Sequence, residues 1–200
     1  MSGQTVSTLR PDLAEIASWI EPGARVLDLG CGDGSLIDFL QRSKDCSGYG
    51  VEIADERVIA CARRGVDVIQ RDIEAGLDMF AGSRFDVVVL SMAIQATQHT
   101  ERVLREMSQV GVECIVSFPN FGHWSHAVAL LRGRMPVSQE MPYRWYDTPN
   151  LHLSTLRDFE ALLDALGLVV TRSRFMAHGR AVSFMPGLRC TQAIYRFRSR

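Results

Sequence analysis

Two carboxylates and three glycines gather in the short segment 28–34 and make the clearest chemical pattern of this chain. The segment runs Asp28-Leu29-Gly30-Cys31-Gly32-Asp33-Gly34 and follows the apolar residues Val26 and Leu27. Glycines let the backbone turn sharply and approach a ligand with no side chain in the way. A helix that begins at Ser35 would aim its first N–H groups at the same place. The pattern is typical of a nucleotide-binding turn between a buried strand and a helix.

The spacing of these residues favours one kind of nucleotide. Dinucleotide sites carry Gly-x-Gly-x-x-Gly with a pyrophosphate at the helix N-terminus, whereas this chain has Gly30-x-Gly32-x-Gly34 with Asp28 and Asp33 beside it. Two unit charges about 4 Å apart interact by roughly 4 kcal/mol at an effective dielectric of about 20, so the acids disfavour a pyrophosphate. They favour S-adenosylmethionine, which carries an ammonium and a sulfonium, or its demethylated product S-adenosylhomocysteine. The alternative is an ordinary strand-to-helix turn in which Asp33 caps the helix.

Polar residues also end the next three apolar segments. Glu52 closes 49–52 and would accept the ribose hydroxyls, with Ile53 against the adenine. Asp72, in 68–73, would accept from the adenine amino group or instead cap the next helix, and Ser91 follows 85–90. The carboxyl ends of parallel strands meet at one rim, where ligands bind. The predicted cofactor residues are therefore Asp28, Gly30, Cys31, Gly32, Glu52, Ile53, Asp72, Ile73 and Ser91.

Two of these residues carry more specific expectations. Cys31 is expected to fill space beneath the turn, although the N-terminus of the following helix could instead activate its thiol. We expect Glu52→Ala to weaken binding of the adenosyl ligand by roughly 1 to 3 kcal/mol, with little effect on folding.

The remaining patterns alternate between helix and strand. Helical apolar spacing marks 9–20, 35–40, 55–64, 100–110 and 155–166, and short apolar runs mark 25–29, 49–52, 68–73, 85–90, 113–118, 168–170 and 190–197. This alternation predicts an α/β fold with a doubly wound, mostly parallel seven-stranded sheet whose last strand is antiparallel. Residues 1–200 are expected to form a single domain.

The segment 119–153 interrupts the alternation, with four of the seven prolines and four aromatic residues that are Trp or Tyr. It is predicted to be an insertion over the ligand rim. As a substrate lid it would supply histidine bases and tyrosines that orient an acceptor, unless the histidines only cap or anchor loops. As a partner surface it would present Trp, Tyr and Arg together. The candidate residues are His123, Trp124, Tyr143, Arg144, Trp145, Tyr146 and His152.

The composition bears on whether the protein holds a metal, spans a membrane or binds nucleic acid. Five scattered cysteines, without a metal-binding spacing, predict no metal site and suit a reducing cytoplasm. No apolar stretch approaches the roughly 20 residues of a membrane span. The net charge is −1, yet seven arginines and no acid follow Thr171. Because arginines alternate with aromatics in 195–198, we expect the solvent face of an edge strand; a nucleic-acid surface is the less favoured alternative.

These motifs resemble known families. The sequence Asp-x-Gly-x-Gly-x-Gly and the expected sheet resemble class I S-adenosylmethionine-dependent methyltransferases. The segments 9–13, 32–36, 117–124, 134–137 and 142–152 resemble the methionine biosynthesis MetW family over nearly the whole chain.

The MetW resemblance implies a cytoplasmic bacterial protein that works beside the homoserine O-acyltransferase MetX, and it implies cofactor positions at Asp28, Gly30, Gly32, Glu52, Asp72 and Ser91. It does not imply methyl transfer by the chain itself. A methyltransferase for a small acceptor is the alternative, although 91–94 lacks the Asn/Asp-Pro-Pro-aromatic sequence of many enzymes that methylate amino groups.

Overall fold

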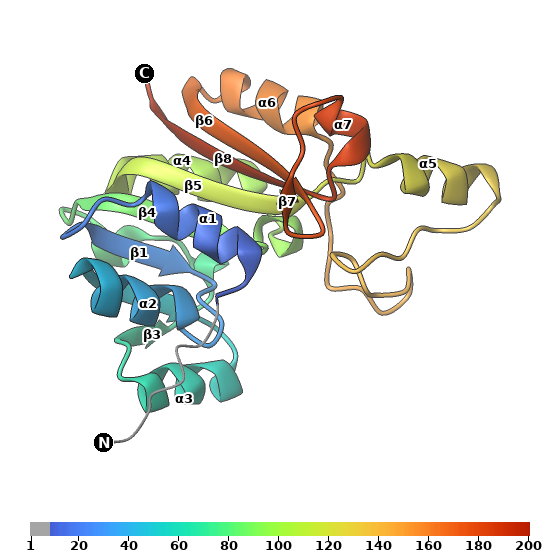
Figure 1. The fold of residues 1–200 in the computed structure, drawn as a ribbon. Coiled ribbons are helices and arrows are strands. Elements are labelled where there is room, and N and C mark those ends of the chain that lie inside the picture. Colours follow the sequence, from blue (N-terminus) through green and yellow to red (C-terminus); the bar gives the residue numbers. More distant parts are fainter. Residues whose placement is uncertain (1–8) are drawn as a thin grey trace.

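The computed structural model describes residues 9–200, which contain one eight-stranded sheet (Figure 1). The strand order is β3-β2-β1-β4-β5-β8-β6-β7, and the pairs from β3 to β5 are parallel whereas those of β8 are antiparallel. The strands are β1 (Arg25–Leu29), β2 (Ser47–Glu52), β3 (Val68–Gln70), β4 (Phe85–Ser91), β5 (Gly111–Pro119), β6 (Leu168–Ala177), β7 (Arg180–Ala181) and β8 (Gln192–Ser199). Residues 1–8, which the expected domain includes, lie outside the described residues.

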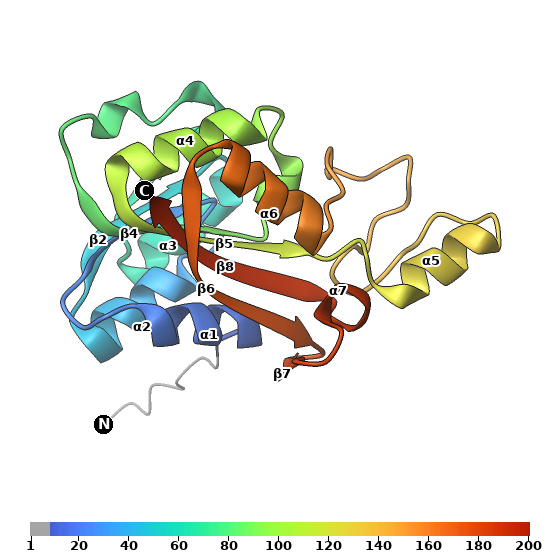
Figure 2. The same cartoon turned by 90° about the horizontal axis from the view of Figure 1, so that it is seen from above.

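Helices cover both faces of this sheet, as the view from above shows (Figure 2). One face carries α1 (Pro11–Trp19), α2 (Ser35–Lys44) and α3 (Asp55–Arg64) and the other carries α4 (Thr100–Val110) and α6 (Leu156–Ala165). The other helices are α5 (Trp124–Leu131), α7 (Pro186–Arg189) and the short 3-10 turns η1 (Ile73–Ala75), η2 (Asp78–Phe80) and η3 (Ile94–Ala96). No helix within residues 9–200 is long and apolar enough to cross a membrane.

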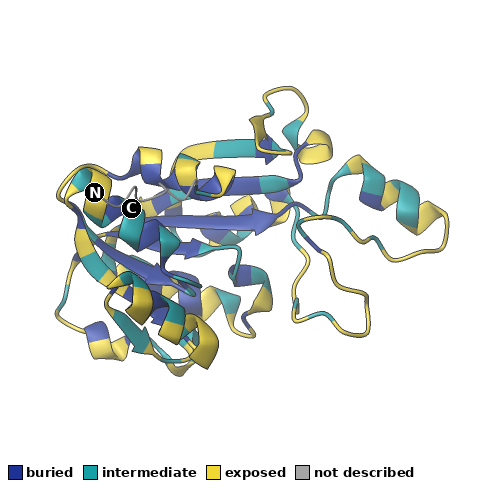
Figure 3. Ribbon diagram, turned by 60° about the horizontal axis from the view of Figure 1, so that its bottom comes forward, coloured by how far each residue is buried: buried dark blue, intermediate teal, exposed yellow. Residues whose placement is uncertain are grey.

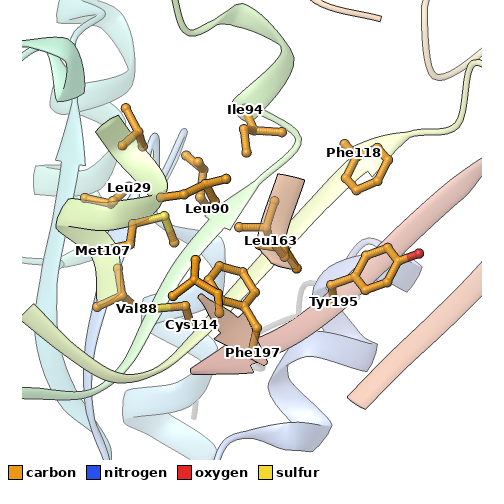
Figure 4. Close-up of a cluster of buried hydrophobic side chains, with 14 of the residues drawn as sticks. Leu29, Val88, Leu90, Ile94, Met107, Cys114, Phe118, Leu163, Tyr195 and Phe197 are labelled. Carbon is orange, nitrogen blue, oxygen red and sulfur yellow. The ribbon is translucent and has the colours of Figure 1, made fainter. Parts of the chain in front are cut away.

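The side chains of β4 explain why the middle of this strand, Val87 to Leu90, is apolar. Val88 and Leu90 pack with α4 and α6, whereas Val87 and Val89 pack with α1 and α2. Figure 4 shows the first cluster, in which Met107 and Leu163 reach from the helices toward the strands. A strand that is covered on both faces has no side chain that faces water. The core therefore fixes the depth and direction of β4, whose end forms part of the rim.

The predicted fold class is confirmed, with two corrections in detail. The two-residue β7 is an eighth strand at the edge of the sheet. The arginine-rich β8 is not an edge strand, because it lies between β5 and β6. Arg196 instead forms an ion pair with Glu113 (3.2 Å) and donates to the carbonyl of Trp19 (3.0 Å). The alternation of aromatics and arginines reflects one face under α6 and one face that α1 covers only in part.

The segment 120–153 leaves the end of β5 and extends away from the sheet with α5, as Figures 1 and 2 both show. Most of its surface is open to solvent (Figure 3). Backbone hydrogen bonds fix its root, since Phe121 N–H donates to the Ser154 carbonyl (3.0 Å) and the N–H groups of Leu151 and His152 donate to the Gln95 carbonyl (2.8 and 3.0 Å). The segment is thus attached to the loop that follows β4.

Candidate functional site

A cleft of about 500 Å³ lies at the carboxyl ends of β1, β2, β3 and β4. All the residues predicted to hold a cofactor line it: Asp28, Gly30, Cys31, Gly32, Glu52, Ile53, Asp72, Ile73 and Ser91. These residues come from four different strand ends, and the parallel arrangement of the strands brings them together. We refer to this cavity as the rim cleft.

The glycine turn is held in a conformation that side chains rarely adopt. Gly30, Gly32 and Gly34 have φ of 66°, 60° and 75°. The N–H groups of Gly30 and Cys31 donate to the Val51 carbonyl at 2.8 and 3.1 Å, which ties the turn to β2. A Cβ on Gly30 would meet Cβ of Ala93 at 3.3 Å. The turn therefore needs glycine both for its backbone angles and for the narrow space above it.

Glu52 is buried and its carboxylate organises the turn. Its Oε2 accepts from the Gly32 N–H at 2.9 Å, and its Oε1 accepts from Ile53 N–H at 2.9 Å and Ala54 N–H at 3.0 Å. An ionised carboxylate has about four acceptor positions, so these bonds leave little capacity for a ligand hydroxyl. Because three backbone N–H groups depend on this carboxylate, we now expect loss of Glu52 to affect folding as well as binding.

Asp28 lies at the floor of the cleft with no hydrogen-bond donor among the described side chains. Burial raises the pKa of its carboxyl to about 7; the Arg10 guanidinium opposes this shift and the charge of Glu52 adds to it. The ionised form of Asp28 is therefore costly in the free protein. A cation in the cleft would favour that form and would be attracted by it.

Asp33 does not add an open negative charge to the site. Its Oδ2 accepts from Arg64 Nη2 at 2.6 Å and its Oδ1 accepts from the Ser35 N–H at 3.2 Å. Burial opposes ionisation of Asp33, but the bonds from Ser35 and Arg64 outweigh it and lower the pKa of the carboxyl. The helix cap is Gly34 rather than Asp33. The turn therefore does not present two open carboxylates, Asp28 and Asp33, to a ligand, as the sequence suggested.

Three arginines that the sequence did not indicate also line the rim cleft: Arg10, Arg57 and Arg71. Arg10 forms an ion pair with Asp12 (2.9 Å) and donates to Ser91 Oγ (3.4 Å), and Ser91 in turn donates to Asp12 (3.3 Å). Arg10 belongs to the segment 9–13 that resembles the MetW family, which was the one available signal. Arginine side chains are long and flexible, so they can reach the cleft from positions outside the cofactor-binding pattern.

Asp72 has the predicted capping role and also lies at the cleft. Its Oδ1 accepts from the Glu74 N–H at 2.8 Å and caps η1, and the residue also lines the cleft. Strand β3 ends at Gln70, so Asp72 and Ile73 follow the strand rather than belong to it.

Cys31 packs beneath the turn, with its Sγ 3.7 Å from Sγ of Cys61. Burial, with smaller effects from Asp28 and Cys61, raises the pKa of the Cys31 thiol far above its usual range. A thiol that stays protonated is a poor nucleophile. This geometry fits the space-filling role rather than the activated one.

The candidates in 119–153 lie outside the rim cleft, as its lining contains none of them. His123 caps α5 by accepting from the Ser125 N–H (3.3 Å), and burial lowers the pKa of its imidazole. Trp124, Tyr143, Trp145 and Tyr146 are exposed, Trp145 by 72%. His152 lines a neighbouring cavity. The loop-anchoring role fits His123, and the aromatics present a surface.

The loop after β4 supplies wall residues that no motif marked, among them Met92, Ala93, Thr97 and Gln98. Met92 has φ of 54°, a strained value for a residue with a side chain. Within residues 9–200 no three His, Cys, Asp or Glu side chains are grouped so that they could hold a metal ion.

Comparison with known proteins places this fold in a defined class. The plantazolicin methyltransferase BpumL, solved in complex with S-adenosylhomocysteine, superposes with a TM-score of 0.65 at 14% identity and covers 95% of this chain and 80% of its own. The fold is that of the class I S-adenosylmethionine-dependent methyltransferases. The sequence matches the family described as methionine biosynthesis protein MetW over residues 10–197, and the chain belongs to this family.

Two curated relatives extend beyond this chain. The bifunctional methionine biosynthesis protein MetXA/MetW of Rhodopirellula baltica is 37% identical over 180 residues, 84% of this chain and 29% of that protein. The trans-aconitate 2-methyltransferase of Mycobacterium tuberculosis is 33% identical over 136 residues, 62% of this chain and 50% of that protein. The chain thus spans less than a third of the first relative and half of the second.

Proposed function

We propose that the rim cleft binds S-adenosylmethionine or S-adenosylhomocysteine. The observation that carries the proposal is the meeting of a buried acid, a rigid glycine turn and three further strand-end residues, Glu52, Asp72 and Ser91, in one cleft. The glycine turn offers backbone close to a ligand, Asp28 suits a cationic group, and Ile53 offers an apolar face for adenine. A solved structure of the same fold in complex with S-adenosylhomocysteine supports this choice.

Titration calorimetry of the full chain tests the cofactor. S-adenosylmethionine and S-adenosylhomocysteine should each bind with one site, whereas NAD should not, because its pyrophosphate would face Asp28. Binding of NAD alone, or of none of the three compounds, would contradict the proposal.

We further propose that the protein acts with a homoserine O-acyltransferase and reports to it the supply of the adenosyl ligand. The support is the relative in which a MetXA part and a MetW part are joined in one chain. The surface for this partner is the aromatic segment, by which we mean residues 120–153, because its Trp145 and Tyr146 are exposed by 72% and 61%. Aromatic and arginine side chains dominate the binding energy of protein interfaces.

The proposed domain and location follow from the same features. Residues 9–200 form one methyltransferase-like domain, in which 119–153 is an insertion. The cysteines are all free and buried, which supports a cytoplasmic protein.

An acyltransferase assay tests the partner role. The rate of homoserine acylation by the partner enzyme should change when this protein is added, and should change again when S-adenosylmethionine is titrated in. The double variant Trp145→Ala, Tyr146→Ala should lose the effect, whereas Ile59→Ala, which removes an exposed apolar residue of α3, should keep it. An acylation rate that does not change when the protein is added, with or without the ligand, would contradict the role.

Methyl transfer to a small acceptor is the second candidate, supported by the trans-aconitate 2-methyltransferase relative. An in-line displacement needs mainly alignment of donor and acceptor, which the wall at Met92 and Ala93 would provide. Incubation with S-adenosylmethionine labelled in its methyl group and a metabolite extract should then label a small molecule. If the label stays on the cofactor, methyl transfer to a small acceptor is contradicted, whereas the partner role is not affected.

A further inference from the structure

A second cavity, of about 630 Å³, lies behind the wall of the rim cleft. It is bounded by the loop after β4, by the first two turns of α4 and by the first turns of α6, and none of the predicted cofactor residues lines it. Gln98 lines both cavities. The volume is within the range of small-molecule sites, roughly 300 to 1,000 Å³. We call it the α4/α6 pocket.

The lining of the α4/α6 pocket combines an apolar floor with charges of both signs. Ile94, Phe159 and Leu162 supply the floor. Arg105 and Glu101 come from α4, and Asp158 comes from α6 across the pocket.

Arg105 and Glu101 form no ion pair with any residue in 9–200. The neighbouring basic side chains are already engaged, because His99 Nδ1 contacts Glu74 (2.8 Å) and Arg102 pairs with Glu106 (3.5 Å). As far as residues 9–200 show, the pocket thus offers the unpaired guanidinium of Arg105 and acidic side chains around an apolar surface.

Gln95 forms part of the wall between the two cavities. Its amide nitrogen donates to the Met92 carbonyl at 2.8 Å. Its Oε1 is buried and has no donor among the described residues. Because this oxygen has almost no surface open to the pocket, the polar contacts available to a ligand are those of the charged side chains.

We propose that the α4/α6 pocket binds a free α-amino acid with an apolar side chain. Its carboxylate would face Arg105, its ammonium would face Glu101 and Asp158, and its side chain would lie on Ile94, Phe159 and Leu162. A dicarboxylate fits less well, because its second charge would meet Glu101 or Asp158. The site is separate from the rim cleft, so the proposal holds whether or not the cleft binds an adenosyl ligand.

Binding of L-norleucine and L-methionine to the full chain, measured by saturation-transfer NMR and titration calorimetry, tests the proposal. Both amino acids should bind. L-norleucine amide, which lacks the carboxylate, and N-acetyl-L-norleucine, which lacks the ammonium, should bind at least about threefold more weakly, in the range of solvent-exposed ion pairs. The proposal would be overturned if the free amino acids did not bind, or if the two blocked derivatives bound as tightly as L-norleucine.

Matched variants locate the site. Arg105→Gln should weaken binding of L-norleucine about three- to tenfold, whereas Arg157→Gln, an exposed arginine on α6 outside the pocket, should not. Asp158→Asn should also weaken binding, and it keeps the backbone N–H that donates to Thr155 Oγ1 and caps α6. Equal effects of Arg105→Gln and Arg157→Gln would overturn the proposed site. Binding of S-adenosylmethionine to each variant, measured in parallel, reports the rim cleft separately.

Discussion

Asp28 and Glu52 are two acids of the same cleft with different tasks. Glu52 accepts from three backbone N–H groups and is committed to the protein's own loop. Asp28 has no such donor within the described residues 9–200, and burial raises the pKa of its carboxyl to about 7. Their neighbours decide this difference, because burial disfavours the ionised form of an acid whose carboxylate accepts no hydrogen bonds. Asp28 is therefore the acid whose charge a ligand can change.

Binding of S-adenosylmethionine should depend on pH through Asp28. The raised pKa means that the free protein holds a proton on Asp28 at pH 6 and has lost it in most molecules at pH 7.5. A cationic ligand prefers the ionised form, so affinity should rise as pH rises through about 7, by roughly tenfold between these two values. Calorimetry at both pH values measures the change. Asp28→Asn should bind weakly at both, and a wild-type affinity that is equal at both would contradict the assignment.

The same shift has a consequence for stability. Because the folded protein holds this proton more tightly than the unfolded chain, the contribution of Asp28 to stability is largest below pH 4 and is lost as pH rises toward about 7. A bound cation would remove that loss.

Replacement of Glu52 should now be expected to cost both binding and stability. In Glu52→Ala the N–H groups of Gly32, Ile53 and Ala54 lose their acceptor, so the free energy of unfolding should fall by about 1 to 3 kcal/mol, together with affinity for the adenosyl ligand. Glu56→Ala, an exposed glutamate on the adjoining helix, is the control. Urea denaturation and calorimetry measure the two effects. An unchanged urea midpoint for Glu52→Ala would show that the turn holds without it.

The contact between β1 and β2 depends on a glycine that the sequence did not single out. Gly48 has φ of 150°, and a Cβ there would lie 1.8 Å from the carbonyl oxygen of Val26 on the neighbouring strand. Gly65 also has a positive φ, of 76°, but nothing lies within 4 Å of its added Cβ. A comparison of the two positions thus distinguishes the effect of close packing, at Gly48, from the effect of the backbone angle alone, at Gly65.

Gly48→Ala should lower the free energy of unfolding by roughly 2 to 3 kcal/mol, because β1 and β2 must move apart. Gly65→Ala should cost about 1 kcal/mol from its backbone angle alone. Chemical denaturation of both variants measures the difference. Equal losses would mean that the strands adjust without cost.

The sequence predicted some elements with their correct bounds and misplaced others for clear reasons. Helices 55–64 and 100–110 were predicted as they occur, since their apolar residues follow a helical period and polar residues bound them. The alternation of aromatics and arginines in 195–198 misled, because alternation shows only that the two faces of a strand differ. It does not show which strands lie beside it. Arg196 can lie in the interior of the sheet because Glu113 pairs with it.

The rim residues were predictable because parallel strands bring their carboxyl ends together, whatever lies between them in sequence. Gln95, Arg57 and Arg71 were not, since their positions depend on loop paths and long side chains. The path of the aromatic segment could not be predicted from the sequence either. Its composition suits both a substrate lid and a partner surface, and these two alternatives differ in the direction in which the segment leaves β5.

The rim cleft and the α4/α6 pocket lie on opposite sides of one loop. The residues between β4 and α4 wall the rim cleft and the α4/α6 pocket, and the Gln95 carbonyl holds the end of the aromatic segment. Ligand sites and a protein-binding surface would then share one short piece of backbone. This arrangement suits a protein whose proposed task is to report a small molecule to a partner enzyme.

The central place of β8 has a consequence for biosynthesis. This strand is made after β5 and β6, yet it must enter between them. While the ribosome is still adding the residues that precede Gln192, β5 and β6 both expose unpaired backbone edges, which are sites of intermolecular association. The nascent chain cannot complete its sheet progressively, and it needs protection from aggregation until the last strand has been translated.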